Sequence, residues 1–149
     1  MPFAPQCVMN PRAEELKRRT FKFALHVIAF CRPLRETWEG RELSDQLFRA
    51  GTRVGANYRA ACRALSHADF VVKIGHVVEE ADETCYWLEV IRAAGIASDV
   101  TLDRLLGEAG QLTAIVSQSQ LTAKANASAY GRRQNRRQRP PILDKSVDS

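Results

Sequence analysis

Apolar residues recur at alternating spacings of three and four along most of the chain, which is the period of an amphipathic α-helix. The first such stretch begins at Glu14 and carries Leu16, Thr20, Phe23, Val27, Phe30 and Leu34. Because Pro33 lacks a backbone N–H, it is expected to kink or end this helix near residue 32. We favour a shallow kink before Leu34.

A second helix is predicted from Gly40 and Arg41, with Glu42 and Asp45 in a first turn where the helix dipole favours acids. At about 100° per residue its apolar positions fall within one arc of about 60°. These positions are Leu43, Leu47, Ala50, Val54, Tyr58, Ala61 and Leu65. We expect this arc to face the core.

Two further helices follow. Ser66 is predicted to cap the third helix, with Asp69 three residues on as in a capping box, and Gly95 to end it in a left-handed conformation. The core face of the third helix is predicted to comprise Phe70, Ile74, Val77, Ala81, Thr84, Leu88 and Ile91. That of the fourth is predicted to comprise Leu102, Leu105, Leu106, Ala109, Leu112, Ile115 and Val116, and the pattern fades by Asn126.

These patterns predict an all-α fold, most simply an up-and-down four-helix bundle over residues 14–126. Residues 1–13 are predicted to be a flexible N-terminal segment. Residues 127–149 contain five arginines between 132 and 139 and then two prolines. Such a segment buries too little apolar surface to offset its ordering entropy, so we predict a disordered basic tail.

Composition narrows the class of protein. The four cysteines lack the C-x-x-C spacing of zinc or redox sites and the density of a disulfide scaffold, so we interpret them as reduced, buried thiols. The basic and apolar run at 17–31 has no small-residue cleavage site and is too short and polar to span a bilayer. We therefore expect a soluble, cytoplasmic protein that does not engage a membrane.

Charge is unevenly distributed along the chain. Residues 11–63 carry 12 Lys and Arg against 6 Asp and Glu, residues 64–126 carry 4 against 9, and residues 127–149 carry 6 against 2. On the second helix five arginines share an arc of about 120° opposite the core. Arginine binds phosphate through planar, bidentate contacts. We therefore predict a nucleic-acid surface made of Arg41, Arg49, Arg53, Arg59, Arg63, Arg132, Arg133, Arg136, Arg137 and Arg139. The alternative is a solvated helix face, or ion pairing to the acids at 79–83.

Glycine inside a helix costs about 1 kcal/mol relative to alanine, so Gly51 and Gly55 require an explanation. A thin helix face lets another backbone come close. We predict that these two glycines, with Tyr86 and Trp87, belong to an interface between subunits. The alternative is that the glycines only relieve crowding inside one bundle.

Catalytic and metal-binding patterns are missing from the sequence. A di-metal bundle requires Glu-x-x-His on two helices, whereas here His76 precedes Glu79 in the reverse order. The three histidines have no patterned nucleophile nearby, and no glycine-rich phosphate loop is present. We predict neither enzymatic activity nor a cofactor or metal.

Four segments together resemble a known family. They are "FKFALHVIAF", "LSDQLFRAGTRVGANYRAA", "SHADFVVKIGHVVEEADETCYWLEVI" and "LLGEAGQLTAIV". They resemble the four-helix-bundle proteins encoded by intervening sequences of large-subunit ribosomal RNA genes, a family that includes the accessory variability determinant of diversity-generating retroelements. The resemblance covers about residues 14–122. It departs at "YRAACRA", where relatives have a Glu-Gly pair and a Gly-Arg.

The resemblance implies a ring-shaped homopentamer without catalytic activity. The retroelement member is basic, binds nucleic acid and partners a reverse transcriptase. Two hypotheses follow for this chain. The first is a homo-oligomeric RNA- or DNA-binding accessory protein, with a reverse transcriptase as a further partner. The second is a structural or protein-interaction scaffold whose charge asymmetry serves assembly.

Overall fold

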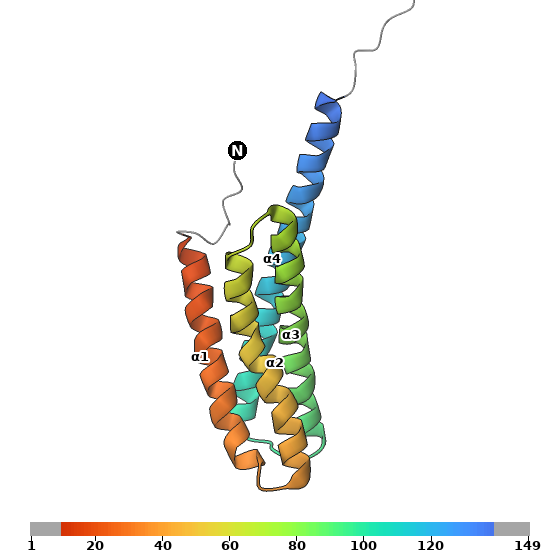
Figure 1. Ribbon diagram of the computed structural model, residues 1–149. Helices are drawn as coiled ribbons and strands as arrows, with labels where there is room; N and C mark the ends of the chain where they lie inside the picture. The colour runs from red at the N-terminus through yellow and green to blue at the C-terminus, as the bar shows by residue number, and fades with distance from the viewer. Residues whose placement is uncertain (1–9, 139–149) are drawn as a thin grey trace, which may run out of the picture.

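The computed structural model describes residues 10–138, which form four α-helices joined by short loops. They are α1 (Pro11–Leu34), α2 (Trp38–Cys62), α3 (His67–Ala93) and α4 (Val100–Arg137). Successive helices run antiparallel around a common core, and α4 projects well beyond the other three (Figure 1). The described part contains no strand. The structure confirms the predicted up-and-down four-helix bundle.

Side chains capping the helix ends explain where each helix begins. Asn10 accepts a hydrogen bond from the Arg12 backbone N–H, and Pro11 occupies the first turn, so α1 starts three residues before the predicted Glu14. Thr37 caps α2 in the same way, so α2 starts at Trp38, two to three residues before the predicted start. Residues 11–13, predicted to be flexible, are therefore helical.

The ends of α1 and α3 follow the predicted signals. Pro33 lies inside α1, which ends one residue later, at Leu34. Ser66 caps α3 by accepting from the Asp69 N–H, and Asp69 in turn accepts from the Leu65 N–H at 3.0 Å. Gly95 has a φ of 72°, the left-handed conformation predicted for the residue after α3.

The core consists mainly of the predicted faces. All seven predicted positions of α3 are buried, and so are Leu47, Ala50, Val54, Tyr58 and Ala61 of α2. Leu65 is the main error, because it is 89% exposed. Since α2 stops at Cys62, the angle per residue that placed Leu65 on the core arc no longer applies there. Ile115, a predicted core position of α4, is also 38% exposed.

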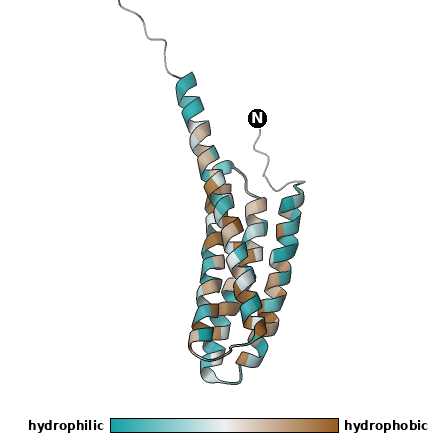
Figure 2. Cartoon of the chain, turned by 180° about the vertical axis from the view of Figure 1, so that it is seen from behind, coloured by the Kyte–Doolittle hydropathy of each residue, from teal (hydrophilic) through white to brown (hydrophobic). Residues whose placement is uncertain are grey.

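The predicted end of the bundle at residue 126 is corrected by α4, which continues to Arg137. Residues 127–137, assigned from composition to a disordered tail, are helical. Alanine, arginine and glutamine are strong helix formers, and cations suit the negative end of the helix dipole. The remainder of the predicted tail, residues 139–149, lies outside the described residues, as do residues 1–9. Seen from behind, the projecting end of α4 is hydrophilic (Figure 2).

Candidate nucleic-acid interface

The four predicted arginines of α2 and Arg63, the residue that caps its C-terminal end, are all exposed, and we call them the α2 arginine face. The face comprises Arg41, Arg49, Arg53, Arg59 and Arg63. Each helix packs against its neighbours in chain order, α1 also meets α4 along a thinner contact, and α2 and α4 lie diagonally across the bundle without adjoining. The α2 arginine face therefore points away from α4.

Two members of this face have partners inside the chain that reduce their availability. Arg53 lies 3.8 Å from the Glu80 carboxylate of α3, which is the ion pairing considered as the alternative. Arg59 lies over the Phe21 ring of α1, 5.7 Å from its centroid, a cation–π contact.

Three members remain. Arg41 donates a hydrogen bond to the Arg35 carbonyl at 3.2 Å. Within residues 10–138, Arg49 and Arg63 form no ion pair. The α2 arginine face is thus partly committed to the bundle's own packing, and Arg49 and Arg63 are its most available cations.

Glu80 of α3 is a largely buried acid beside this face. Its side chain is only 17% exposed, and its Oε2 is buried without a hydrogen-bond partner in the described part of the chain. Burial raises the pKa of the Glu80 carboxyl, and Arg53 opposes this shift. Arg53 is therefore better explained as a counter-ion to Glu80 than as a phosphate ligand.

Gly51 and Gly55 lie inside the bundle, packed against α1. A Cβ on Gly51 would come within 2.9 Å of both Val27 methyl groups, and a Cβ on Gly55 within 3.1 Å of the Thr20 hydroxyl. Both glycines are buried by their own chain. Relief of crowding within one bundle, the alternative left open above, therefore accounts for them, and their assignment to a subunit interface is corrected. The sequence identifies a thin helix face but does not show which neighbour lies against it.

Of the other predicted interface residues, Tyr86 lies on the outer side of α3, whereas Trp87 is half-buried and packs against the core. Tyr86 is 56% exposed, and its ring meets the Trp87 ring edge-on, with centroids 4.9 Å apart. The Trp87 indole N–H donates to Glu83 at 3.0 Å. The Tyr86 ring remains accessible at the surface.

The last three turns of α4, residues 127–137, are called the α4 extension here. The extension carries four predicted arginines, Arg132, Arg133, Arg136 and Arg137, and all four are exposed. None of them forms an ion pair within residues 10–138. The fifth predicted arginine, Arg139, lies outside the described residues.

The stretch of α4 that leads to these arginines contains no negative side chain. No Asp or Glu occurs between residues 109 and 138, and the last buried residue of α4 is Ala123. Beyond it the helix projects past the end of α3 (Figure 1). Within residues 10–138, these cations therefore lack the ion-pair partner that Arg53 has.

Tyr130 was not singled out from the sequence, although it lies next to these arginines. It is 66% exposed, and its hydroxyl accepts a hydrogen bond from Gln134 at 2.9 Å. The available signal was the spacing of Tyr130 three and seven residues before Arg133 and Arg137, which places the three on one side of a helix. An exposed aromatic ring beside arginines suits stacking on nucleic-acid bases.

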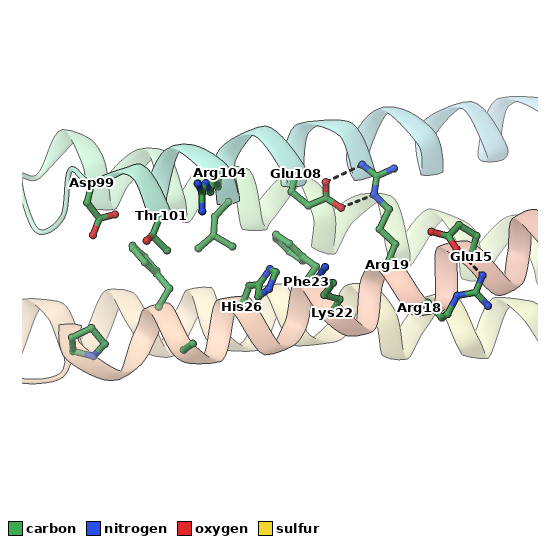
Figure 3. A pocket seen from close by; sticks show the side chains of 14 residues that line it. Glu15, Arg18, Arg19, Lys22, Phe23, His26, Asp99, Thr101, Arg104 and Glu108 are labelled. Carbon is green, nitrogen blue, oxygen red and sulfur yellow. Dashed lines mark hydrogen bonds and ion pairs between the residues drawn. The ribbon is translucent and has the colours of Figure 1, made fainter.

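A groove between α1 and α4 is a feature that sequence reasoning missed. Two open cavities of about 810 and 850 Å³ lie along it. Between α1 and α4, Arg19 bonds Glu108 through two nitrogens, at 2.5 and 2.8 Å (Figure 3). A third bond from Arg19 reaches Gln111 at 2.6 Å. The Glu108 carboxylate raises the pKa of Arg19. Phe23 and Lys22 of α1 also line the groove, which is therefore mixed in polarity and charge.

Burial raises the pKa of the Cys31 thiol to about 11, so this cysteine stays protonated at neutral pH. Within residues 10–138, no three His, Cys, Asp or Glu side chains are grouped so that they would hold a metal ion. None of the described helices is long and apolar enough to cross a bilayer.

The family is established by comparison with known proteins. The model of the 23S rRNA-intervening sequence proteins matches residues 13–118. The chain belongs to this family. Among solved structures it is similar to a protein of unknown function from the S23 ribosomal protein family of Bacteroides thetaiotaomicron. The two are 26% identical with a TM-score of 0.66, and the match covers 71% of this chain and 95% of that one. The chain has no match among curated proteins.

The matched region ends before the α4 extension. The family model stops at residue 118, whereas the arginines begin at 132. Membership of the family therefore accounts for the bundle but not for the extension, whose role has to be argued from its own residues.

Proposed function

We propose that this protein is a non-enzymatic, homo-oligomeric nucleic-acid-binding accessory protein that contacts phosphates mainly through the α4 extension. The observation that carries the proposal is the stretch from 109 to 138, which contains no acid and ends in four exposed arginines without ion-pair partners in the described part. Like charges at i and i+4, as in Arg132 and Arg136, destabilise an isolated helix. A polyanion removes that repulsion.

Binding of nucleic acid is tested by a salt titration. Fluorescence anisotropy would follow labelled nucleic acid from about 50 to about 200 mM salt, where each neutralised phosphate contributes about −0.9 to the slope of log affinity against log salt. The variant replaces Arg132, Arg133, Arg136 and Arg137 with glutamine, which keeps helix propensity. We expect weaker binding and a slope shallower by about 2 to 4.

A matched control replaces Gln134 and Asn135 with alanine on the same turns of α4. This change removes polar side chains without altering charge, so affinity and slope should stay near those of the original chain. Absence of binding at about 50 mM salt, where electrostatic contacts are strongest, would contradict the proposed function.

The oligomeric part of the proposal is supported by the family resemblance, which implies a ring of five subunits, and by the exposed Tyr86 ring beside the half-buried Trp87. Light scattering at micromolar concentration is expected to give five times the chain mass, and a monomer mass would contradict it.

The same resemblance makes a reverse transcriptase a further proposed partner. Copurification from cells expressing both proteins is the test.

A structural scaffold is the second candidate, and one observation favours it. The outer side of α3 exposes Glu79, Asp82, Glu83 and Glu89, and no Lys or Arg occurs from 74 to 91. Such a stripe repels nucleic acid and suits a basic protein surface. If the arginine variant leaves nucleic-acid binding unchanged but lowers the oligomer mass, the scaffold is the better explanation.

A further inference from the structure

The arginines of the α4 extension form two rows. At about 100° per residue, Arg132 and Arg136 lie about 40° apart, and Arg133 and Arg137 form an equal pair rotated by about 100° from the first. Within each row the Cα atoms are about 6 Å apart along the axis. The arginines therefore project from one helix in two parallel rows of positive charge.

Only a small side chain separates the two rows. Ala129 falls between them on the helical projection, and Tyr130 lies at the outer edge of the second row. Because alanine adds a single methyl group, the helix backbone there can approach a surface closely while arginines reach out on either side. This arrangement fits a groove with phosphates on both rims.

Most of the extension is accessible. Residues 127–138 are exposed except Ala129, which is half-buried, and no other helix runs beside this end of α4 (Figure 1). An α-helix with its side chains is about 10–12 Å wide, and the major groove of B-form DNA is about 12 Å wide. The major groove of an A-form RNA duplex is deep and too narrow for side chains to read.

We propose that the α4 extension enters the major groove of B-form duplex DNA, with its two arginine rows on the phosphates of the two strands. This inference rests on the proposed function and specifies its ligand. About 16 Å of helix, from 127 to 137, spans roughly half a turn of the duplex. The arginine side chains then contact the phosphates of both DNA strands, and Ala129 lies nearest the base edges.

The first experiment compares an 18-base-pair DNA duplex with an RNA duplex of the same sequence, both titrated with the full chain at one salt concentration. Entry into the major groove predicts tighter binding to DNA by at least about tenfold. Dimethyl sulfate methylation of guanine N7, which lies in the major groove, should be reduced in the DNA complex. A minor-groove ligand such as distamycin should not displace the protein.

A pair of variants tests the position of the helix in the groove. Ala129→Leu places bulk between the arginine rows and should lower DNA-duplex affinity about tenfold or more, with less effect on single-stranded DNA. Ala127→Leu places the same bulk about 160° away, on the opposite side of the helix, and should leave duplex affinity within about twofold. Both sites lie beyond the last buried residue of α4, so thermal unfolding of the bundle should not change.

The outcomes separate the two proposals. Equal affinity for the DNA and RNA duplexes, or a preference for RNA, would overturn groove entry while leaving nucleic-acid binding intact. Equal effects of Ala129→Leu and Ala127→Leu would overturn it as well. Failure to bind any of these nucleic acids would instead contradict the proposed function.

Discussion

Val27 lies under Gly51, and this contact shows how single atoms determine the packing of α1 on α2. Changing Gly51 to Ala would place a methyl group 2.9 Å from both Val27 methyls. Overpacking of this kind costs about 1–3 kcal/mol, of which alanine's better helix propensity offsets up to about 1 kcal/mol. We expect the Gly51→Ala variant to unfold at a lower urea concentration than the original chain.

Gly107 provides the control for this prediction. It is also helical, but nothing lies within 4 Å of a Cβ placed there, so Gly107→Ala should stabilise the bundle by up to about 1 kcal/mol. Combining Gly51→Ala with Val27→Ala should relieve the crowding and give a non-additive double-mutant cycle. Additive effects would show that the Val27 contact does not limit the approach of the two helices.

Glu80 and Asp69 should respond to pH in opposite directions. Burial raises the pKa of Glu80 above 4.5, so its ionisation costs folding free energy as pH rises through the folded value. Bonds from the Leu65 N–H and Lys73 lower the pKa of Asp69 below 3.8, so its contribution is present at neutral pH and is lost as pH falls through the folded value.

Two variants test these signs. Glu80→Gln should stabilise the protein at pH 7, and the gain should shrink below pH 4.5, where the unfolded carboxyl is also protonated. Asp69→Asn should destabilise it at pH 7, with a smaller loss near pH 3. Urea unfolding at both pH values measures each difference. A gain from Glu80→Gln that grows on acidification would contradict the assigned cause.

The positions of the helices and their buried faces depend mainly on local sequence. The core face of α3 was predicted in full because a residue's position on a helix follows from its number alone. The end of α4 was not, because composition alone does not distinguish a solvated helix of Ala, Gln and Arg from a disordered tail. Likewise, the pairing of Arg53 with Glu80, and the burial of Gly51 by α1, depend on which helices become neighbours.

The α1–α4 groove follows from the weaker packing of these two helices, and it makes the Arg19 to Glu108 bridge important for their pairing. Both side chains are 29% exposed, and the bridge is bidentate. We expect a double-mutant cycle of Arg19→Met and Glu108→Gln to give a coupling of about 1 kcal/mol, the upper end for exposed pairs. The same cycle on Arg18 and Glu15, a far more exposed pair within α1, should give less. Equal couplings would show that the bridge contributes nothing beyond a surface ion pair.

At the scale of the whole molecule, the charge asymmetry of the chain becomes an arrangement in space. The family match covers the bundle, and the strongest cationic feature lies outside it, on an extension that projects from one end. The α2 arginine face and α4 are diagonal across the bundle. A short duplex seated on the extension therefore does not reach the N-terminal half of α2, where Arg41 and Arg49 lie.

This separation leads to a prediction about the length of nucleic acid. With a duplex of about 12 base pairs, about one turn, only the extension has room to bind, so Arg41→Gln with Arg49→Gln should leave affinity and salt slope nearly unchanged. With a duplex several turns long, bound by several subunits, the same double variant should remove up to about 1.8 from the slope, because two phosphate contacts per subunit are lost. The four glutamine substitutions in the extension should weaken binding at both lengths. Anisotropy titrations of the three proteins on the two duplexes measure the affinity and the salt slope.

If the α2 variant weakens binding to the short duplex as much as the extension variant does, the two surfaces act on one ligand and the diagonal arrangement does not separate them.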